Sequence, residues 1–131
     1  MNDASTPIVK DLVLVGGYDA QASAECTRTL LAGADRPTAI FAANDVSAIA
    51  AIQAAVGLGL RVPADLSVVG FDNIPESALC APPLTTVNQP IRQMGERSIQ
   101  LLLRLMRGDH VEDTHITLQT DLVVRQSARA R

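Results

Sequence analysis

With 131 residues, the chain has the length of one domain and can bury a hydrophobic core. Its net charge of -3 excludes the strongly basic surface that is typical of a nucleic-acid-binding domain. Aromatic residues make up only 2% of a chain that is 47% hydrophobic, so the core must be built from Ala, Val, Leu and Ile.

Cysteine usage and hydropathy indicate the cellular compartment. Cys26 and Cys80 are isolated and show neither a CxxC motif nor metal-ligand spacing, which favours a reduced protein. The first residues lack the basic start and apolar core of a signal peptide. The apolar run at 101–105 is too short to span a membrane, and it is interrupted by an arginine. We therefore expect a cytoplasmic chain with no membrane partner.

The chain opens with a polar stretch and then alternates between predicted strands and helices. Residues 11–15 predict a strand that ends at Gly16-Gly17-Tyr18-Asp19. Residues 20–32 are amphipathic and predict a helix, which Gly33 ends.

The next unit, residues 38–58, predicts a strand that leads directly into a helix. Residues 38–43 are apolar without alternation, as in a strand covered on both faces of a parallel sheet. Asn44 and Asp45 interrupt this run and suit the N-cap of a helix. No charged residue follows between Val46 and Leu60, so we expect a second subunit to cover the outer face of this helix.

The same alternation continues to the end of the chain. Further strands are expected at residues 66–71, 84–87 and 116–124, and further helices at 74–80 and 90–107. Strands alternating with helices across short connections predict an α/β fold with a parallel sheet and right-handed crossovers.

Three of the predicted strands end in polar or aromatic clusters: Gly17-Tyr18-Asp19, Asn44-Asp45 and Asp72-Asn73. The carboxyl ends of parallel strands lie along one edge of a sheet, so these clusters should converge there. Carboxylates and amides can hold hydroxyl or ring N–H groups, and a tyrosine ring can stack on a sugar or a base. The edge therefore suits a small polyol or a nucleobase.

A simpler interpretation stays open for each cluster. Asn44 and Asp45 could serve only as helix caps, Asp72 and Asn73 could only form a turn, and Tyr18 could be a half-buried packing residue.

Other polar groups in the chain do not form a catalytic set. His110 and His115 lie among acidic residues in a late segment, which we interpret as an exposed charged loop rather than a metal site. The cluster of Arg125, Arg129 and Arg131 is interpreted as a solvated tail. No Ser/His/Asp or Cys/His set can be assembled, so neither an enzyme, nor a metal, nor a cofactor is expected.

Three long motifs resemble the LacI/GalR family of bacterial transcription regulators. They are PTAIFAAND at 37–45, GLRVPADLSVVGFDN at 59–73 and PPLTTV at 82–87. The resemblance covers the chain from about Ile8 to Ser127, and only the C-terminal portion of such a regulator. It implies an α/β fold, namely a parallel-sheet, three-layer subdomain of the type I periplasmic-binding-protein-like fold.

The resemblance also implies a division of the chain, 1–131, between two subdomains around a ligand cleft. Residues 8–87 and 116–127 would form the core of the C-terminal subdomain. Residues 88–115 would belong to the N-terminal subdomain, whose remainder, like the helix-turn-helix and hinge helix, is expected outside these residues. The apolar face of the helix at 90–107 would then lack its usual cover and favour self-association.

The family pattern implies roles for individual residues. The position of Tyr18 packs on the effector, those of Asn44 and Asp72 hydrogen-bond to it, and that of Gln89 lies at a crossover beside the cleft. Family effectors are often sugars or purines. The family is typically dimeric, through the helix after Asn44-Asp45 and the segment after Asp72. This dimer face implies interface roles for three residues, Ile49, Ile52 and Leu79.

The leading hypothesis is therefore that the chain is the ligand-sensing and dimerisation portion of a regulator. In this regulator, a helix-turn-helix outside this chain binds the operator. A fragment of a periplasmic sugar-binding protein of a transporter is the alternative, because it shares the fold. The crossover at 85–90 and the Val-Gly-Phe-Asp strand end resemble the regulators more closely. An α/β enzyme is disfavoured, because no catalytic set is present.

Overall fold

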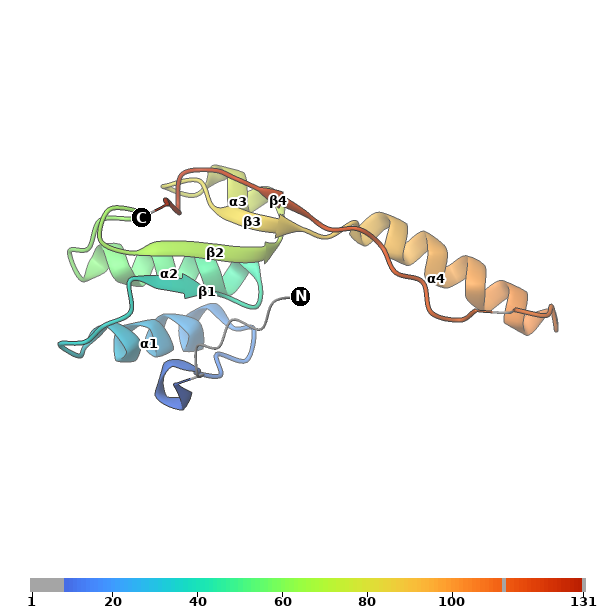
Figure 1. The fold of residues 1–131 in the computed structure, drawn as a ribbon, viewed down its shortest axis with the longest axis horizontal. Coiled ribbons are helices and arrows are strands. Elements are labelled where there is room, and N and C mark those ends of the chain that lie inside the picture. Colours follow the sequence, from blue (N-terminus) through green and yellow to red (C-terminus); the bar gives the residue numbers. More distant parts are fainter. Residues whose placement is uncertain (1–8, 112, 131) are drawn as a thin grey trace.

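The computed structural model describes residues 9–111 and 113–130, in which the strands form one sheet (Figure 1). The strand order is β1-β2-β3-β4. The first three strands pair in parallel and β4 pairs antiparallel with β3, so the predicted α/β fold with a mostly parallel sheet is confirmed. The bounds are β1 Ala39–Phe41, β2 Ser67–Asp72, β3 Thr85–Asn88 and β4 Asp121–Val123.

Two helices pack against each other beside the sheet (Figure 1). In α1, Ala20–Leu31, the Asp19 side chain accepts a hydrogen bond from the backbone N–H of Ala22 and so caps the first turn. In α2, Asp45–Gly57, Asn44 makes the equivalent cap. Two other helices, α3 (Pro75–Leu79) and α4 (Ile91–Met106), and a short 3-10 turn η1 (Lys10–Leu12) complete the elements.

The core lies between α2 and one face of the sheet. It is built around the buried side chains of Ile52, Leu66, Val68 and Leu84, together with alanines of α2. Burial alternates along β2, because Val68 and Gly70 face α2 while Val69 and Phe71 are half-buried on the opposite face. On β1, Phe41 is 66% exposed. The composition of the apolar run at 38–43 predicted a strand covered on both faces. This prediction is wrong, because one face of β1 is exposed at Phe41.

Burial in the core corrects one predicted interface residue. Ile52 is only 1% exposed and packs against the chain's own sheet, so its side chain is not available to a partner subunit. Ile49 is half-buried and Leu79 is exposed, so both remain accessible.

The strand predicted at residues 11–15 is not formed. Residues 10–12 make the η1 turn, and Val15, at 91% exposure, makes no sheet pairing. A groove of about 500 Å³ separates the segment 12–18 from β1. The segment has the composition of a strand, but it lacks a neighbouring strand within hydrogen-bonding reach.

The helix α4 extends away from the sheet, and the chain then returns beside it to β4 (Figure 1). No residue of α4 is buried, so its apolar face is open, as the sequence predicted. The exposed large side chains of this face include Ile91, Met94, Ile99, Leu102 and Met106. The last strand is shorter than predicted, because residues 116–120 run along α4 without pairing in the sheet. Among the described residues, no helix is both long and apolar enough for a transmembrane span.

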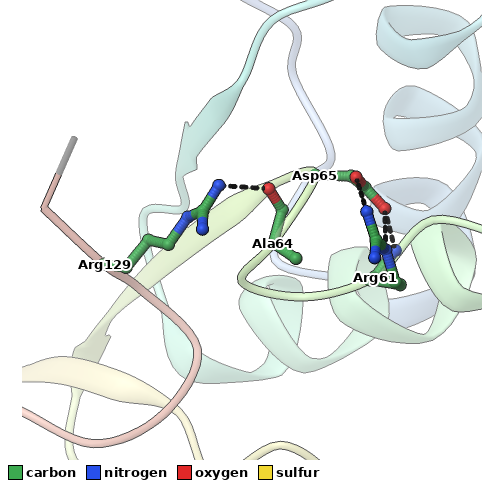
Figure 2. A network of polar contacts seen from close by, with 4 residues as sticks. All are labelled: Arg61, Ala64, Asp65 and Arg129. Carbon is green, nitrogen blue, oxygen red and sulfur yellow. Dashed lines mark hydrogen bonds and ion pairs between the residues drawn. The ribbon is translucent and has the colours of Figure 1, made fainter.

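The C-terminal segment is bound to the sheet and does not form the predicted solvated tail. The Ser127 hydroxyl donates to the Val68 carbonyl oxygen at 2.6 Å and accepts from the Thr85 N–H at 2.8 Å, so it joins β2 to β3. Two residues later, the Arg129 guanidinium donates to the Ala64 carbonyl oxygen at 2.7 Å (Figure 2). Arg131 lies outside the described residues.

The turn that Arg129 contacts is closed by an ion pair between Arg61 and Asp65 (Figure 2). The side-chain hydrogen bonds from Arg61 hold the pKa of the Asp65 carboxyl well below its ordinary value. Because the folded state lowers this pKa, the pair stabilises the fold at neutral pH, and its contribution is lost as the pH falls through the acidic range. The pair is solvent-exposed, so this contribution is small.

Candidate functional site

The carboxyl ends of the three parallel strands bring three of the predicted site residues to one edge of the sheet. Asn44 follows β1, Asp72 ends β2 in register with Asn88 of β3, and Gln89 comes directly after β3. From this same edge the chain departs to α4 (Figure 1). Polar side chains therefore lie together at this edge, where the chain leaves the sheet after β3 and re-enters it at β4.

Asp72 and Gln89 contact each other directly. The Gln89 side-chain amide donates to Oδ1 of Asp72 at 2.7 Å. Asp72 is half-buried, and within the described part of the chain its other carboxylate oxygen accepts no hydrogen bond. One oxygen is thus fixed by the protein, and the second can accept a hydrogen bond from a bound molecule.

The backbone at Asp72 adopts a conformation that is costly for a residue with a side chain. Its φ is 116°, and that of Asn73 is 62°. Non-glycine residues rarely adopt positive φ, and such conformations persist only where surrounding contacts fix them, often at functional sites. The strained turn therefore makes this strand end a candidate functional site.

Asp45 supplies one of the contacts that fix the turn. Its side chain is completely buried, and its Oδ2 accepts from the Ile74 N–H at 2.9 Å. Its Oδ1 accepts from the Thr86 hydroxyl at 2.5 Å, so the carboxylate joins α2 to both β3 and the turn after β2. Both oxygens are occupied inside the fold. Asp45 is therefore a structural residue rather than part of a ligand site.

Asn73 is also occupied within the fold. Its amide donates to Oδ1 of Asn88 at 3.0 Å, and its own Oδ1 accepts from the Arg125 guanidinium at 2.7 Å. In each predicted pair, one residue thus holds the fold together, Asp45 in the first and Asn73 in the second. The other residue, Asn44 or Asp72, retains hydrogen-bonding capacity at the edge.

Asn44 is compatible with both interpretations that its sequence position left open. Its Oδ1 accepts from the Ser47 N–H at 2.9 Å, so the predicted N-cap is confirmed. The amide nitrogen of this half-buried side chain makes no hydrogen bond to the described residues. It can donate to a ligand at the edge of the sheet without disturbing the cap.

Tyr18 stands apart from the other three residues. It follows Gly17 in a turn where both have positive φ, 60° and 59°, immediately before the N-cap of α1. The side chain is 70% exposed, which excludes its interpretation as a half-buried packing residue. It lines the groove beside β1, and no hydrogen bond links it to Asp72 or Gln89 in the part of the chain that is described.

The late charged loop lies at the far end of α4 and not at this edge (Figure 1). Among residues 9–111 and 113–130, no three His, Cys, Asp or Glu side chains are grouped as metal ligands. Glu112, which was considered with the two histidines, lies outside the described residues. Among the described residues, the structure thus offers hydrogen-bonding groups for a bound molecule, but no set of metal ligands.

Comparison with known proteins identifies the fold. A family model described as a periplasmic binding protein-like domain matches residues 5–128. The chain belongs to this family. A transcriptional repressor, PurR of Pasteurella multocida, is 39% identical to it over 131 residues. That match covers 100% of this chain and 39% of the repressor, so the chain spans about two fifths of this relative's length.

Two solved structures agree with this assignment. The transcriptional regulator CelR in complex with cellobiose matches with a TM-score of 0.89 and 34% identity, over 95% of this chain and 38% of CelR. The lac repressor dimer bound to operator and the anti-inducer ONPF matches with a TM-score of 0.78 and 39% identity, over 85% of this chain and 38% of the repressor. The resemblance to the effector-binding domain of LacI/GalR regulators is thereby confirmed.

Proposed function

We propose that this chain is the ligand-sensing and dimerisation portion of a LacI-family transcriptional regulator. In this proposal a small effector bound at the strand-end edge changes operator binding by a helix-turn-helix outside the 131 residues. The observation that carries the proposal is the Asp72 carboxylate, held in a strained backbone conformation with one oxygen bound to Gln89 and one free. The regulator would act in the cytoplasm without a cofactor.

The chemistry of the edge favours an effector with several hydroxyl or ring N–H groups. The free oxygen of Asp72 accepts such donors, and the Asn44 amide can donate to a hydroxyl or ring nitrogen. The exposed ring of Tyr18 can stack on a sugar face or a base if the effector extends toward α1. These groups match a sugar or a nucleobase, and the CelR complex with cellobiose supports the first of these classes.

The path of the chain supports a cleft that is completed by a second subdomain. The backbone leaves the sheet after Asn88 and returns at Asp121, and α4 between these points buries no residue against the sheet. We propose that residues 8–87 and 116–127 form one wall of the cleft, and that 88–115 belong to the subdomain forming the other wall. Gln89 then lies at the hinge between them.

The Asp72→Ala variant of the intact regulator tests the proposal. We expect effector affinity to fall at least about tenfold, because a hydrogen bond between a carboxylate and a ligand donor is lost. Affinity would be measured by calorimetry, after a thermal-shift screen with cellobiose, maltose, galactose, ribose, adenine and hypoxanthine. Operator binding without effector should be retained.

The Asp72→Asn variant is the matched control, because it preserves the size of the side chain. Its single oxygen can accept from the ligand when the Gln89 amide turns so that the Gln89 oxygen accepts from the new NH₂ group. The variant should weaken binding less than alanine does if the ligand donates a single hydrogen bond. An unchanged effector affinity in Asp72→Ala would remove this residue from the site and overturn the proposal.

The proposal includes a homodimer formed through α2 and α3. The exposed side of α2 carries no charge, with Ile49 half-buried and Val46 and Val56 exposed, and Leu79 at the end of α3 is 83% exposed. The lac repressor structure, which is a dimer, supports the formation of a dimer. Ile52 is not part of the proposed interface, because it is buried in the core.

The Leu79→Arg variant tests the dimer. We expect sedimentation velocity of the intact protein at micromolar concentration to show a shift toward monomer, because a charge would be buried without a partner. Val124→Arg introduces the same charge at another exposed apolar residue and should leave the dimer intact. A monomeric parent protein, or an unchanged dimer in Leu79→Arg, would contradict the proposed interface.

A further inference from the structure

We propose that Arg125 is a positioning residue for Asp72, to which it is linked through Asn73 and Asn88. The inference rests on the proposed function for its effect on ligand binding, because Asp72 is the proposed effector-binding carboxylate. Arg125 follows β4, on the segment that returns from α4, and lies 52 residues along the chain from Asn73. It was predicted to be part of a solvated tail, so its contacts are a finding of the structure.

The half-buried Arg125 guanidinium holds three segments together. One terminal nitrogen donates to the Leu84 carbonyl oxygen at 2.7 Å and to the Ser77 hydroxyl at 3.0 Å. The other donates to Oδ1 of Asn73 at 2.7 Å. The donors of a guanidinium have a fixed planar arrangement, so fixing Leu84 and Ser77 also fixes the position of the Asn73 oxygen.

Asn73 transmits this constraint toward Asp72. Because its oxygen is bound by Arg125, the Asn73 amide nitrogen points to Oδ1 of Asn88, at 3.0 Å. The residue after Asn88 is Gln89, whose amide donates to Asp72. Asp72 is therefore held from both sides, through its backbone bond to Asn73 and through the Gln89 side chain.

The conformation of the turn explains why such a constraint is needed. Positive φ at two consecutive non-glycine residues, Asp72 and Asn73, costs free energy that the surrounding contacts must offset. Arg125 supplies one of these contacts from the segment directly after β4, and Gln89 supplies another from the start of the connection that leads from β3 to α4. The segments that follow β3 and β4 thus both contact the turn at residues 72–73, so a displacement of either segment would alter the position of the Asp72 carboxylate.

The first test needs no effector and uses hydrogen exchange in the intact protein. In Arg125→Gln, the amide of Ile74, which donates to the Asp45 carboxylate, should exchange at least about tenfold faster, because the strained turn opens locally. The amides of Val68 to Gly70 within β2 should keep their protection. Unchanged exchange at the turn, or equal acceleration throughout β2, would overturn the inference, because the latter indicates only a general loss of stability.

Arg129→Gln is the matched control, because it removes a guanidinium from the same C-terminal segment. Arg129 donates to the Ala64 carbonyl oxygen, in the turn before β2 (Figure 2). It makes no hydrogen bond to Asn73, whose partners are Asn88, Ser77 and Arg125. This variant should leave exchange at Ile74 unchanged. Acceleration there as large as in Arg125→Gln would contradict a specific role of Arg125.

The second test uses the screened compound that gives the largest thermal shift, and measures its dissociation constant by calorimetry. We expect Arg125→Gln to raise this constant about fivefold to tenfold in the parent protein and to have no further effect in the Asp72→Ala background. Equal effects in both backgrounds would show that Arg125 does not act through Asp72. If no screened compound binds the parent protein, the role of Arg125 in effector binding is overturned together with the proposed function. The hydrogen-exchange experiment still decides whether Arg125 fixes the turn at Asp72 and Asn73.

Discussion

Asp45→Ala is expected to lower the free energy of unfolding by about 3 kcal/mol, as measured by urea denaturation of the intact protein. The carboxylate is completely buried and accepts from the Ile74 N–H and the Thr86 hydroxyl. Alanine would leave both donors unsatisfied in the interior, and it would release the turn after β2 from α2. A residue predicted only as a strand-end ligand or cap is therefore a main support of the fold.

Asp45→Asn distinguishes the loss of hydrogen bonds from the loss of shape. The amide retains one acceptor oxygen for Ile74, and its NH₂ group can donate to the Thr86 hydroxyl oxygen. We expect a smaller loss than with alanine, about 1–2 kcal/mol. A loss below about 1 kcal/mol for Asp45→Ala would show that the two donors find other partners, and that the carboxylate does not hold the turn.

Gly70→Ala is expected to destabilise the protein by a similar amount, about 3 kcal/mol, through overpacking. A Cβ at this position would overlap Oδ1 of Asp45 and lie only 2.9 Å from a methyl carbon of Leu84 and 3.2 Å from the Ala48 Cβ. The Asp45 oxygen cannot retreat without losing its hydrogen bond to Thr86. The close approach of α2 to β2 thus requires glycine here.

Gly57→Ala is the matched control, because the same atom is added where nothing lies within 4 Å. Gly57 ends α2, where alanine is the better helix former, so stability should stay equal or rise by up to about 1 kcal/mol. Urea denaturation of both variants provides the comparison. Equal stability of Gly70→Ala and the parent would contradict the tight packing between α2 and β2.

The helices could be predicted from local sequence because their ends carry their own signals. Asn44 caps α2 as expected, and Gly108, with φ of 76°, follows the end of α4. The strand at residues 11–15 could not be predicted in the same way. A strand forms only where a neighbouring strand accepts its backbone hydrogen bonds, and the sequence of the segment does not contain that information.

The gathering of polar strand ends at one edge of the sheet was predicted, but the roles of the individual residues there were not distinguished. Parallel strands place their carboxyl ends together, so Asn44 and Asp72 could be located by topology alone. Whether Asp45 and Asn73 point into the fold depends on partners such as Thr86 and Arg125, which lie 41 and 52 residues away along the chain. No local sequence pattern predicts contacts between residues that lie so far apart along the chain.

The uniform composition of α2 explains the error at Ile52. An amphipathic helix shows which side faces the core, but α2 is apolar nearly all round, so its sequence gives no such direction. In the structure, Ile52 faces the sheet while Ile49 is only half-buried. Burial could be assigned only after the position of the helix on the sheet was known.

A crystal structure of the intact protein with the tightest-binding screened compound tests the central claim most directly. We predict that the compound lies at the strand-end edge, with a hydroxyl or ring N–H within hydrogen-bonding distance of the Asp72 oxygen that is not bound by Gln89. A compound bound elsewhere, with the Asp72 carboxylate contacting only protein, would contradict the assignment of this edge as the effector site.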